Sequence, residues 1–133
     1  MTSQNSPERW DIFCAVVDNY GDIGVTWRLA KQLSAEQPIA ITLWVDDLKS
    51  FSHILPALDP NLISQVHFGV TINQWSEPLA ISYQAGTVLI EAFACELPES
   101  VKNNLIAIHQ VYKLDSSAAK PPLWLNLEYL SAE

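Results

Sequence analysis

Cysteine, basic residues and long apolar runs are all scarce in this sequence. Its 2 cysteines, Cys14 and Cys95, stand far apart and form neither a C-x-x-C pair nor a framework of disulfides. No basic segment followed by an apolar run marks a secretory signal, and no apolar stretch is long enough to span a bilayer. These absences argue against a secreted or membrane-spanning protein and predict a cytoplasmic one.

The shortage of positive charge narrows the range of partners. The chain carries 7 lysines and arginines against 15 aspartates and glutamates, which gives a formal net charge of −8. Nucleic-acid binding depends on lysine and arginine at the phosphates, so that function is disfavoured. An acidic surface would instead attract a basic partner, although the same charge also serves solubility alone.

Length and apolar content predict a single domain. The 133 residues are 49% hydrophobic, which supplies enough apolar side chains for one core. We expect residues 10–133 to form this domain and the polar residues 1–9 to be a disordered lead-in. Within the domain, a continuous apolar run at 12–17 predicts a strand buried on both faces, and Val25, Leu29 and Leu33 then recur at the spacing of one helix face.

Two carboxylates and two glycines lie where the strand pattern gives way to the helix pattern. Gly21 and Gly24 let the backbone turn tightly or approach a ligand closely, and Asp22 stands where an N-cap belongs. The segment matches neither glycine-rich phosphate loop, and its Asp spacing is not that of a calcium loop or a zinc site. Asp18 and Asp22 therefore remain either a pair that accepts protons or grips a cation, or merely a turn residue and a cap.

The rest of the chain alternates between strand and helix patterns, which predicts an α/β fold with a parallel sheet flanked by helices. Strands are expected at 12–17, 39–45, 66–68, 70–72, 87–90 and 123–127, and helices after Gly24, over 48–58 and from Pro98 to Tyr112. Asp46 and Asp47 follow one strand and are expected to cap the next helix. Glu91 follows another strand and is expected to face the same crevice as Asp18, where it would either grip a substrate or support the loop.

Four blocks of sequence together resemble a known family, the protein-arginine rhamnosyltransferases that modify elongation factor P. The blocks are residues 10–30, 43–48, 90–98 and 124–133, with residues 52–86 and 99–121 matching only loosely. Members of this family are considerably longer. The chain therefore looks like an amino-terminal fragment of such an enzyme.

The resemblance implies a fold and a reaction. The fold is the Rossmann-like, acceptor-side amino-terminal domain of a GT-B glycosyltransferase, whose donor, dTDP-β-L-rhamnose, is held mainly by a carboxyl-terminal domain outside this chain. The reaction is an inverting transfer of rhamnose to an arginine of elongation factor P, which activates that factor for translation of polyproline stretches. No metal or other cofactor is implied, and the fragment alone is expected to be inactive.

The nucleophile makes demands that a carboxylate pair can meet. A guanidinium has a pKa above about 12 and no free lone pair, so one carboxylate can hold its planar fork while another receives the proton. The resemblance gives the role of base to Asp22 and an orienting role to Asp18. A helix amino-terminus makes Asp22 a weaker base, whereas a second carboxylate nearby raises the first protonation of the pair. Which of the two carries the proton stays open.

Further residues are candidates for contact with the substrate: Asn19, Tyr20, Gly21, Gly24 and Glu91. The alternative function is a non-catalytic acidic α/β module that binds a basic partner protein. A flavodoxin-like domain that binds a mononucleotide is weaker, because the first loop is not built to receive a phosphate.

Overall fold

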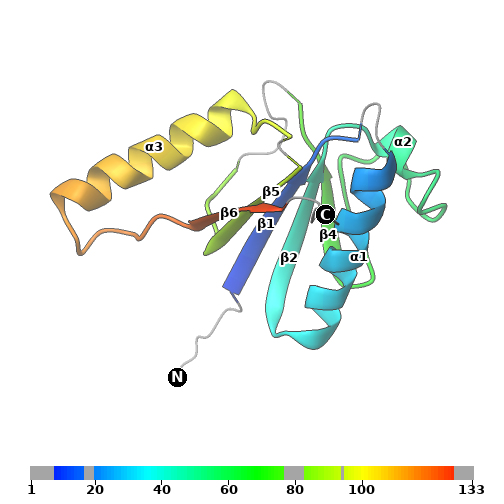
Figure 1. Ribbon diagram of the computed structural model, residues 1–133, viewed down its shortest axis with the longest axis horizontal. Coiled ribbons are helices and arrows are strands. Elements are labelled where there is room, and N and C mark those ends of the chain that lie inside the picture. Colours follow the sequence, from blue (N-terminus) through cyan, green and yellow to red (C-terminus); the bar gives the residue numbers. More distant parts are fainter. Residues whose placement is uncertain (1–7, 17–19, 77–82, 94, 128–133) are drawn as a thin grey trace, which may run out of the picture.

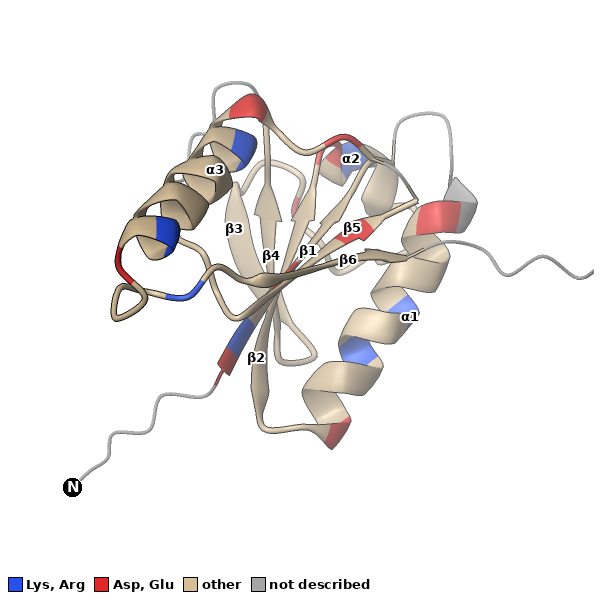
Figure 2. Cartoon of the chain, turned by 60° about the vertical axis from the view of Figure 1, so that its left-hand side comes forward, with Lys and Arg blue, Asp and Glu red and all other residues tan. Residues whose placement is uncertain are grey.

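The computed structural model describes residues 8–16, 20–76, 83–93 and 95–127. In this part of the chain six strands form one sheet in the order β3-β4-β2-β1-β5-β6. Helices α1 and α3 lie on opposite sides of the sheet (Figures 1 and 2). The elements are β1 (Glu8–Cys14), α1 (Tyr20–Glu36), β2 (Ile39–Val45), α2 (Leu48–Phe51), β3 (Ser64–His67), β4 (Val70–Gln74), β5 (Val88–Ala92), α3 (Glu99–Leu114) and β6 (Leu123–Leu127).

The sheet is parallel except at one edge. Strand β1 pairs in parallel with β2 and β5, β2 with β4, and β5 with β6. Strand β3 alone runs antiparallel, to β4, through a tight connection in which Phe68 and Gly69 have φ angles of 55° and 79°. The predicted α/β fold with a largely parallel sheet is confirmed.

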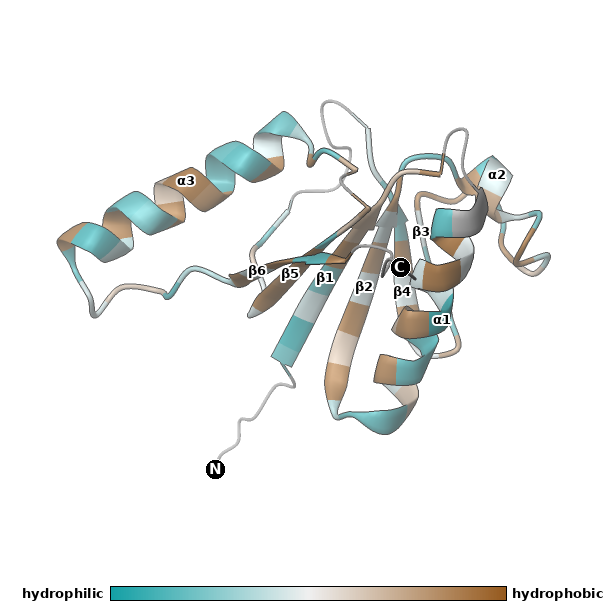
Figure 3. Cartoon of the chain, viewed as in Figure 1, coloured by the Kyte–Doolittle hydropathy of each residue, from teal (hydrophilic) through white to brown (hydrophobic). Residues whose placement is uncertain are grey.

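Alternation along the strands divides the core into two layers. Successive strand residues point to opposite faces, so Ile12 and Cys14 face α1 whereas Phe13 faces α3. On the first face, α1 buries Ile23 and Trp27 against the sheet. Figure 3 shows the concentration of apolar residues along the strands that results. This two-sided burial explains why β1 reads as a continuous apolar run.

The second layer is built around stacked aromatic rings. Phe13 and Trp44 stack with ring centroids 5.4 Å apart and an interplanar angle of 6°. Tyr83 meets both rings edge-on, at 5.9 Å and 6.2 Å. Helix α3 buries Val101 and Leu105 against this cluster. Its later turns leave large apolar side chains exposed, namely Ile106, Val111 and Leu114.

Several element boundaries differ from the sequence-based prediction. Strand β1 begins at Glu8, although residues 8 and 9 were predicted to belong to the lead-in, and it ends at Cys14 rather than at residue 17. Helix α2 stops at Phe51 instead of reaching residue 58. Pro56, which has no N–H and disfavours helical geometry in the residue before it, prevents a helix from continuing through residues 55–58. Leu55 and Leu58 are buried nevertheless, since the turns that follow α2 still pack on the core.

Candidate functional site at the carboxyl edge of the sheet

The carboxyl ends of β1, β2 and β5 meet at one edge, and α1 begins there. Parallel strands in register bring these ends together, the edge at which open α/β sheets bind ligands. Acidic residues stand at this edge in three segments: Asp22 in the first turn of α1, Asp46 directly after β2, and Glu91 near the end of β5. Figure 2 shows acidic positions in red at this end of the sheet. The fold therefore gathers negative charge where a ligand is expected.

Asp22 lies inside α1 rather than at its cap. Because α1 begins at Tyr20, the predicted N-cap role of Asp22 is wrong; it is the acidic residue of the first turn, where the helix dipole favours a carboxylate. Thr26, which is buried, donates a hydrogen bond from Oγ1 to the Asp22 carbonyl oxygen at 2.7 Å. This bond fastens the turn that carries the carboxylate.

The glycines also belong to the helix. Gly21 and Gly24 both lie within α1, so the predicted glycine loop is shorter than expected. A Cβ added to Gly24 would meet no atom of the described residues within 4 Å, so none of them requires a glycine there. Asp18 and Asn19 lie outside the described residues, and Tyr20 is placed only as the first residue of α1.

Two thiols lie near the carboxyl edge of the sheet: Cys14 ends β1, and Cys95 donates a hydrogen bond to the Phe13 carbonyl oxygen at 3.3 Å. The pKa of Cys14 is raised to about 11, mainly by burial; the charges of Asp22 and Asp46 contribute to this rise, and the Thr26 side chain opposes it. Burial likewise raises the pKa of Cys95 to about 12, with Glu91, Cys14 and Asp46 adding to the effect. The thiols are thus neutral at pH 7 and are poor nucleophiles.

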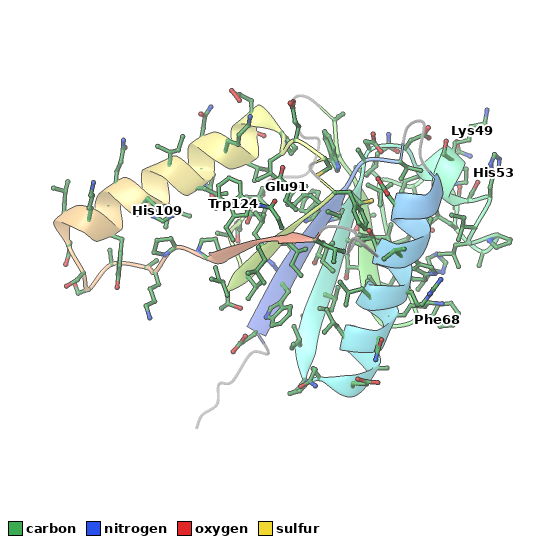
Figure 4. The ribbon with its side chains drawn as sticks, in the orientation of Figure 1. Lys49, His53, Phe68, Glu91, His109 and Trp124 are labelled. Atoms are coloured by element: carbon green, nitrogen blue, oxygen red, sulfur yellow. The ribbon has the colours of Figure 1, made fainter. Side chains whose placement is uncertain are left out.

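Glu91 reaches this edge from the opposite face to α1. It pairs in register with Phe13, so its side chain lies on the α3 face of the sheet. Its Oε1 accepts a hydrogen bond from the indole nitrogen of Trp124 on β6 at 3.2 Å (Figure 4). Glu91 and Asp22 therefore approach the edge from opposite faces of the sheet. Asp18, with which Glu91 was predicted to share a crevice, lies outside the described residues.

The structure adds one carboxylate at this edge, Asp46, and shows a second one, Asp11, buried in the middle of β1. Asp46 accepts a hydrogen bond from the Val16 backbone N–H at 2.6 Å, whereas it was predicted to cap a helix. The cap of α2 is Asp47 alone, which accepts from the Ser50 N–H at 3.2 Å. Asp11, which is 1% exposed, accepts from the Trp44 indole at 3.1 Å. The sequence signal that could have singled out Asp11 is its position as a charged residue within an apolar strand.

Further classes of site are absent from the described part of the chain. Within residues 8–16, 20–76, 83–93 and 95–127, no three His, Cys, Asp or Glu side chains are grouped so that they could hold a metal ion. Over the same ranges, no helix combines the length and apolarity that crossing a membrane requires.

The fold and its edge define a Rossmann-like α/β domain that presents carboxylates, rather than a phosphate-binding glycine loop, at its strand ends. The chain belongs to the family described as Elongation-Factor P (EF-P) rhamnosyltransferase EarP, whose sequence profile matches residues 10–133. The family inferred from the resemblance is confirmed.

Relatives from three genera agree with this assignment, and each is named protein-arginine rhamnosyltransferase. The protein of Shewanella oneidensis is 62% identical over 133 residues, which is 100% of this chain and 32% of the relative. That of Pseudomonas aeruginosa is 52% identical over 124 residues, 93% of this chain and 30% of the relative. That of Neisseria meningitidis is 41% identical over 124 residues, 92% of this chain and 29% of the relative. The chain thus spans about a third of the length of these relatives.

Proposed function

We propose that this chain supplies the acceptor-side half of an inverting GT-B glycosyltransferase, which moves rhamnose from dTDP-β-L-rhamnose to an arginine of elongation factor P. The proposal is supported by membership of the family and by the names of its relatives. The structural observation that carries it is the presence of Asp22, Asp46 and Glu91 at one edge of the sheet. An anionic edge of this kind suits a guanidinium acceptor.

The chemistry assigns separate roles to the carboxylates. A guanidinium nitrogen attacks the anomeric carbon, the nucleotide diphosphate leaves with the electron pair of the broken bond, and the nitrogen loses a proton as the new bond forms. Asp22 receives that proton, and Asp18 orients the planar fork. Asn19, Tyr20, Gly21, Gly24 and Glu91 line the acceptor, and the donor is held by the part of the enzyme beyond this chain. No metal takes part.

Rhamnosyl transfer can be tested directly on the full-length protein. Incubated with dTDP-β-L-rhamnose and elongation factor P, it should add the mass of one deoxyhexose to a single arginine, located by peptide mass spectrometry. Replacing that arginine of the acceptor by lysine should abolish the gain, and EDTA should leave it unchanged. The 133-residue chain alone should give no product. An intact, folded enzyme that leaves elongation factor P unmodified would overturn the proposal.

A second function is favoured by the net charge of −8. An acidic domain can dock a basic partner without catalysing any reaction. Titration of the separate 133-residue chain with elongation factor P, followed by calorimetry, measures that docking by itself. Binding by the chain together with no transfer by the full-length protein would identify a binding module rather than half of an enzyme.

A further inference from the structure

Asp46 connects two strands at the carboxyl edge. Its Oδ1 accepts a hydrogen bond from the backbone N–H of Val16 at 2.6 Å, across 30 positions of sequence. Strand β1 ends at Cys14, which pairs with Val45, so the N–H of Val16 lies beyond the last partner in the sheet. A half-buried N–H at a strand end needs an acceptor, and an ionised carboxylate is a strong one. Asp46 supplies it.

The position of Val16 gives this hydrogen bond its importance. Val16 is 1% exposed and is followed, after residues 17–19, by the start of α1 at Tyr20. The chain from Val16 to the first turn of α1 carries both proposed acid–base residues, Asp18 and Asp22. Asp46 therefore holds the chain at the point where it leaves β1 for that turn.

The other end of the same stretch is fastened as well. Thr26 donates to the Asp22 carbonyl oxygen at 2.7 Å, and Ile23 of the same turn is buried in one core cluster with Cys14, so the first turn of α1 packs on the end of β1. Asp46 follows Val45, the register partner of Cys14, so it lies beside the same end of β1. The stretch is anchored at both ends, and Asp46 provides the anchor that comes from another strand.

The neighbouring residue, Asp47, forms only local hydrogen bonds among those that the structure shows for its side chain. Its carboxylate accepts from the Ser50 N–H at 3.2 Å and from the Ser50 hydroxyl at 2.8 Å, and both bonds lie within α2. Two adjacent aspartates thus bond to different parts of the chain. Asp47 caps the helix that follows it, and Asp46 bonds to the backbone just beyond the end of β1. This difference makes Asp47 a matched control for Asp46.

We propose that Asp46 is a positioning residue for rhamnosyl transfer. By holding the backbone of Val16, it sets where the chain that carries Asp18 and Asp22 leaves the sheet, and small displacements of acid–base groups cost large factors in rate. The effect passes through the hydrogen bond and not through contact between Asp46 and the acceptor. This inference rests on the proposed function.

The test uses two variants of the full-length protein at position 46. Asp46→Asn keeps a carbonyl oxygen for the Val16 N–H, and Asp46→Ala removes it. We expect Asp46→Ala to lower kcat about 100-fold with an unchanged Kd for dTDP-β-L-rhamnose, and Asp46→Asn to restore kcat to within about threefold. Hydrogen exchange of the Val16 amide should accelerate in Asp46→Ala alone. Asp47→Ala should lower the melting temperature and leave kcat at the parent value.

Each other outcome has a definite meaning. A kcat of Asp46→Ala near that of the parent overturns the positioning role, as does a rise in the KM for elongation factor P at constant kcat, which would mean direct contact. If Asp46→Ala does not fold, Asp46→Asn still decides: a kcat near the parent value supports the hydrogen-bond role, and a 100-fold loss with normal Val16 exchange overturns it. A parent protein that transfers no rhamnose refutes the proposed function, and the Val16 exchange then tests the tether independently.

Discussion

The indole nitrogen of Trp124 donates a hydrogen bond to the Oε1 atom of Glu91 over 3.2 Å, joining β6 to β5 at the carboxyl edge of the sheet. The bond lies near the surface, since Trp124 is 44% exposed. It gives Glu91 a structural partner. The proposed contact of Glu91 with the acceptor must therefore be separated from its support of β6.

Replacement of Glu91 by glutamine separates these two roles. Glutamine keeps an oxygen that can accept from Trp124, so Glu91→Gln should change the free energy of unfolding by less than about 1 kcal/mol. It removes the charge, so the KM for elongation factor P should rise about tenfold, the loss of one partly exposed charge-assisted hydrogen bond. Trp124→Phe, the control, should lower stability and leave that KM unchanged. An unaltered KM in Glu91→Gln would reduce Glu91 to a support for β6.

Asp22→Asn tests the proposed base in the full-length protein. Because Asp22 lies in the first turn of α1, the change loses a favourable interaction with the helix dipole, worth about 0.3–1 kcal/mol. Asparagine cannot accept the proton, so turnover should fall about 100-fold or more. Asp18→Asn should also lose much of the activity, and donor binding should be unchanged in both. A variant that melts early but turns over near the parent rate would end the assignment of Asp22 as base.

Two glycines should respond oppositely to alanine. A Cβ on Gly86 would lie 2.1 Å from the Arg9 carbonyl oxygen, so Gly86→Ala should destabilise the protein by about 1–3 kcal/mol. A Cβ on Gly24 would meet no atom of the described residues within 4 Å, and alanine is the better helix former, so Gly24→Ala should stabilise by up to about 1 kcal/mol. Thermal unfolding measures both changes.

Gly24→Ala also tests the predicted contact with substrate. If the acceptor uses the open space beside Gly24, the added methyl group should raise the KM for elongation factor P even as the melting temperature rises. An unchanged KM in this more stable variant would remove Gly24 from the substrate-binding residues.

Asp11 should make the folded protein sensitive to pH. Burial raises the pKa of Asp11 above its ordinary value of 3.8, although hydrogen bonds from Trp44 and Arg9 oppose the rise. The folded protein therefore retains a proton that the unfolded chain has already released, so this residue's contribution to stability falls as pH rises from about 3.8 through the raised pKa. Asp11→Asn should gain stability relative to the parent between pH 3.5 and pH 7, measured by urea unfolding.

Asp47 offers a control of opposite sign. Hydrogen bonds from Ser50 lower the pKa of Asp47, so its contribution is present above about 3.8 and is lost as pH falls through the lowered pKa. Asp47→Asn should therefore lose stability relative to the parent over the same rise in pH. Identical pH profiles for the two variants would contradict the opposite environments of these carboxylates.

The 133-residue chain made alone should expose an apolar surface on β6 that promotes self-association. On β6, Leu123 is 59% and Leu125 is 42% exposed. Both side chains lie on the same face of the sheet as α1, but α1 packs on other strands of that face. The chain should bind a hydrophobic dye and self-associate, and Leu123→Lys with Leu125→Lys should reduce both effects. Val66→Lys on the other edge strand, where Val66 is 63% exposed, is the matched control. A monodisperse chain without dye binding would contradict this expectation.

Local patterns in the sequence were enough to predict the class of fold and most of its elements. Alternation over residues 39–45 predicted β2 with its observed bounds, because successive side chains of a strand point to opposite faces of the sheet. The cap of α2 by Asp47 was also predictable from local sequence, because the donor and the acceptor lie only three positions apart. The resemblance of four sequence blocks to one family was also sufficient to identify that family.

Only the tertiary structure decided where the charged groups of the edge find their partners. Asp46 bonds to Val16 across 30 positions and Glu91 to Trp124 across 33. The helix around Asp22 starts earlier than its glycines suggested, and β3 turns antiparallel at the edge of the sheet. The physical reason is common to these cases. Such contacts depend on which strands become neighbours and in what register, and no periodicity within a single segment records that choice.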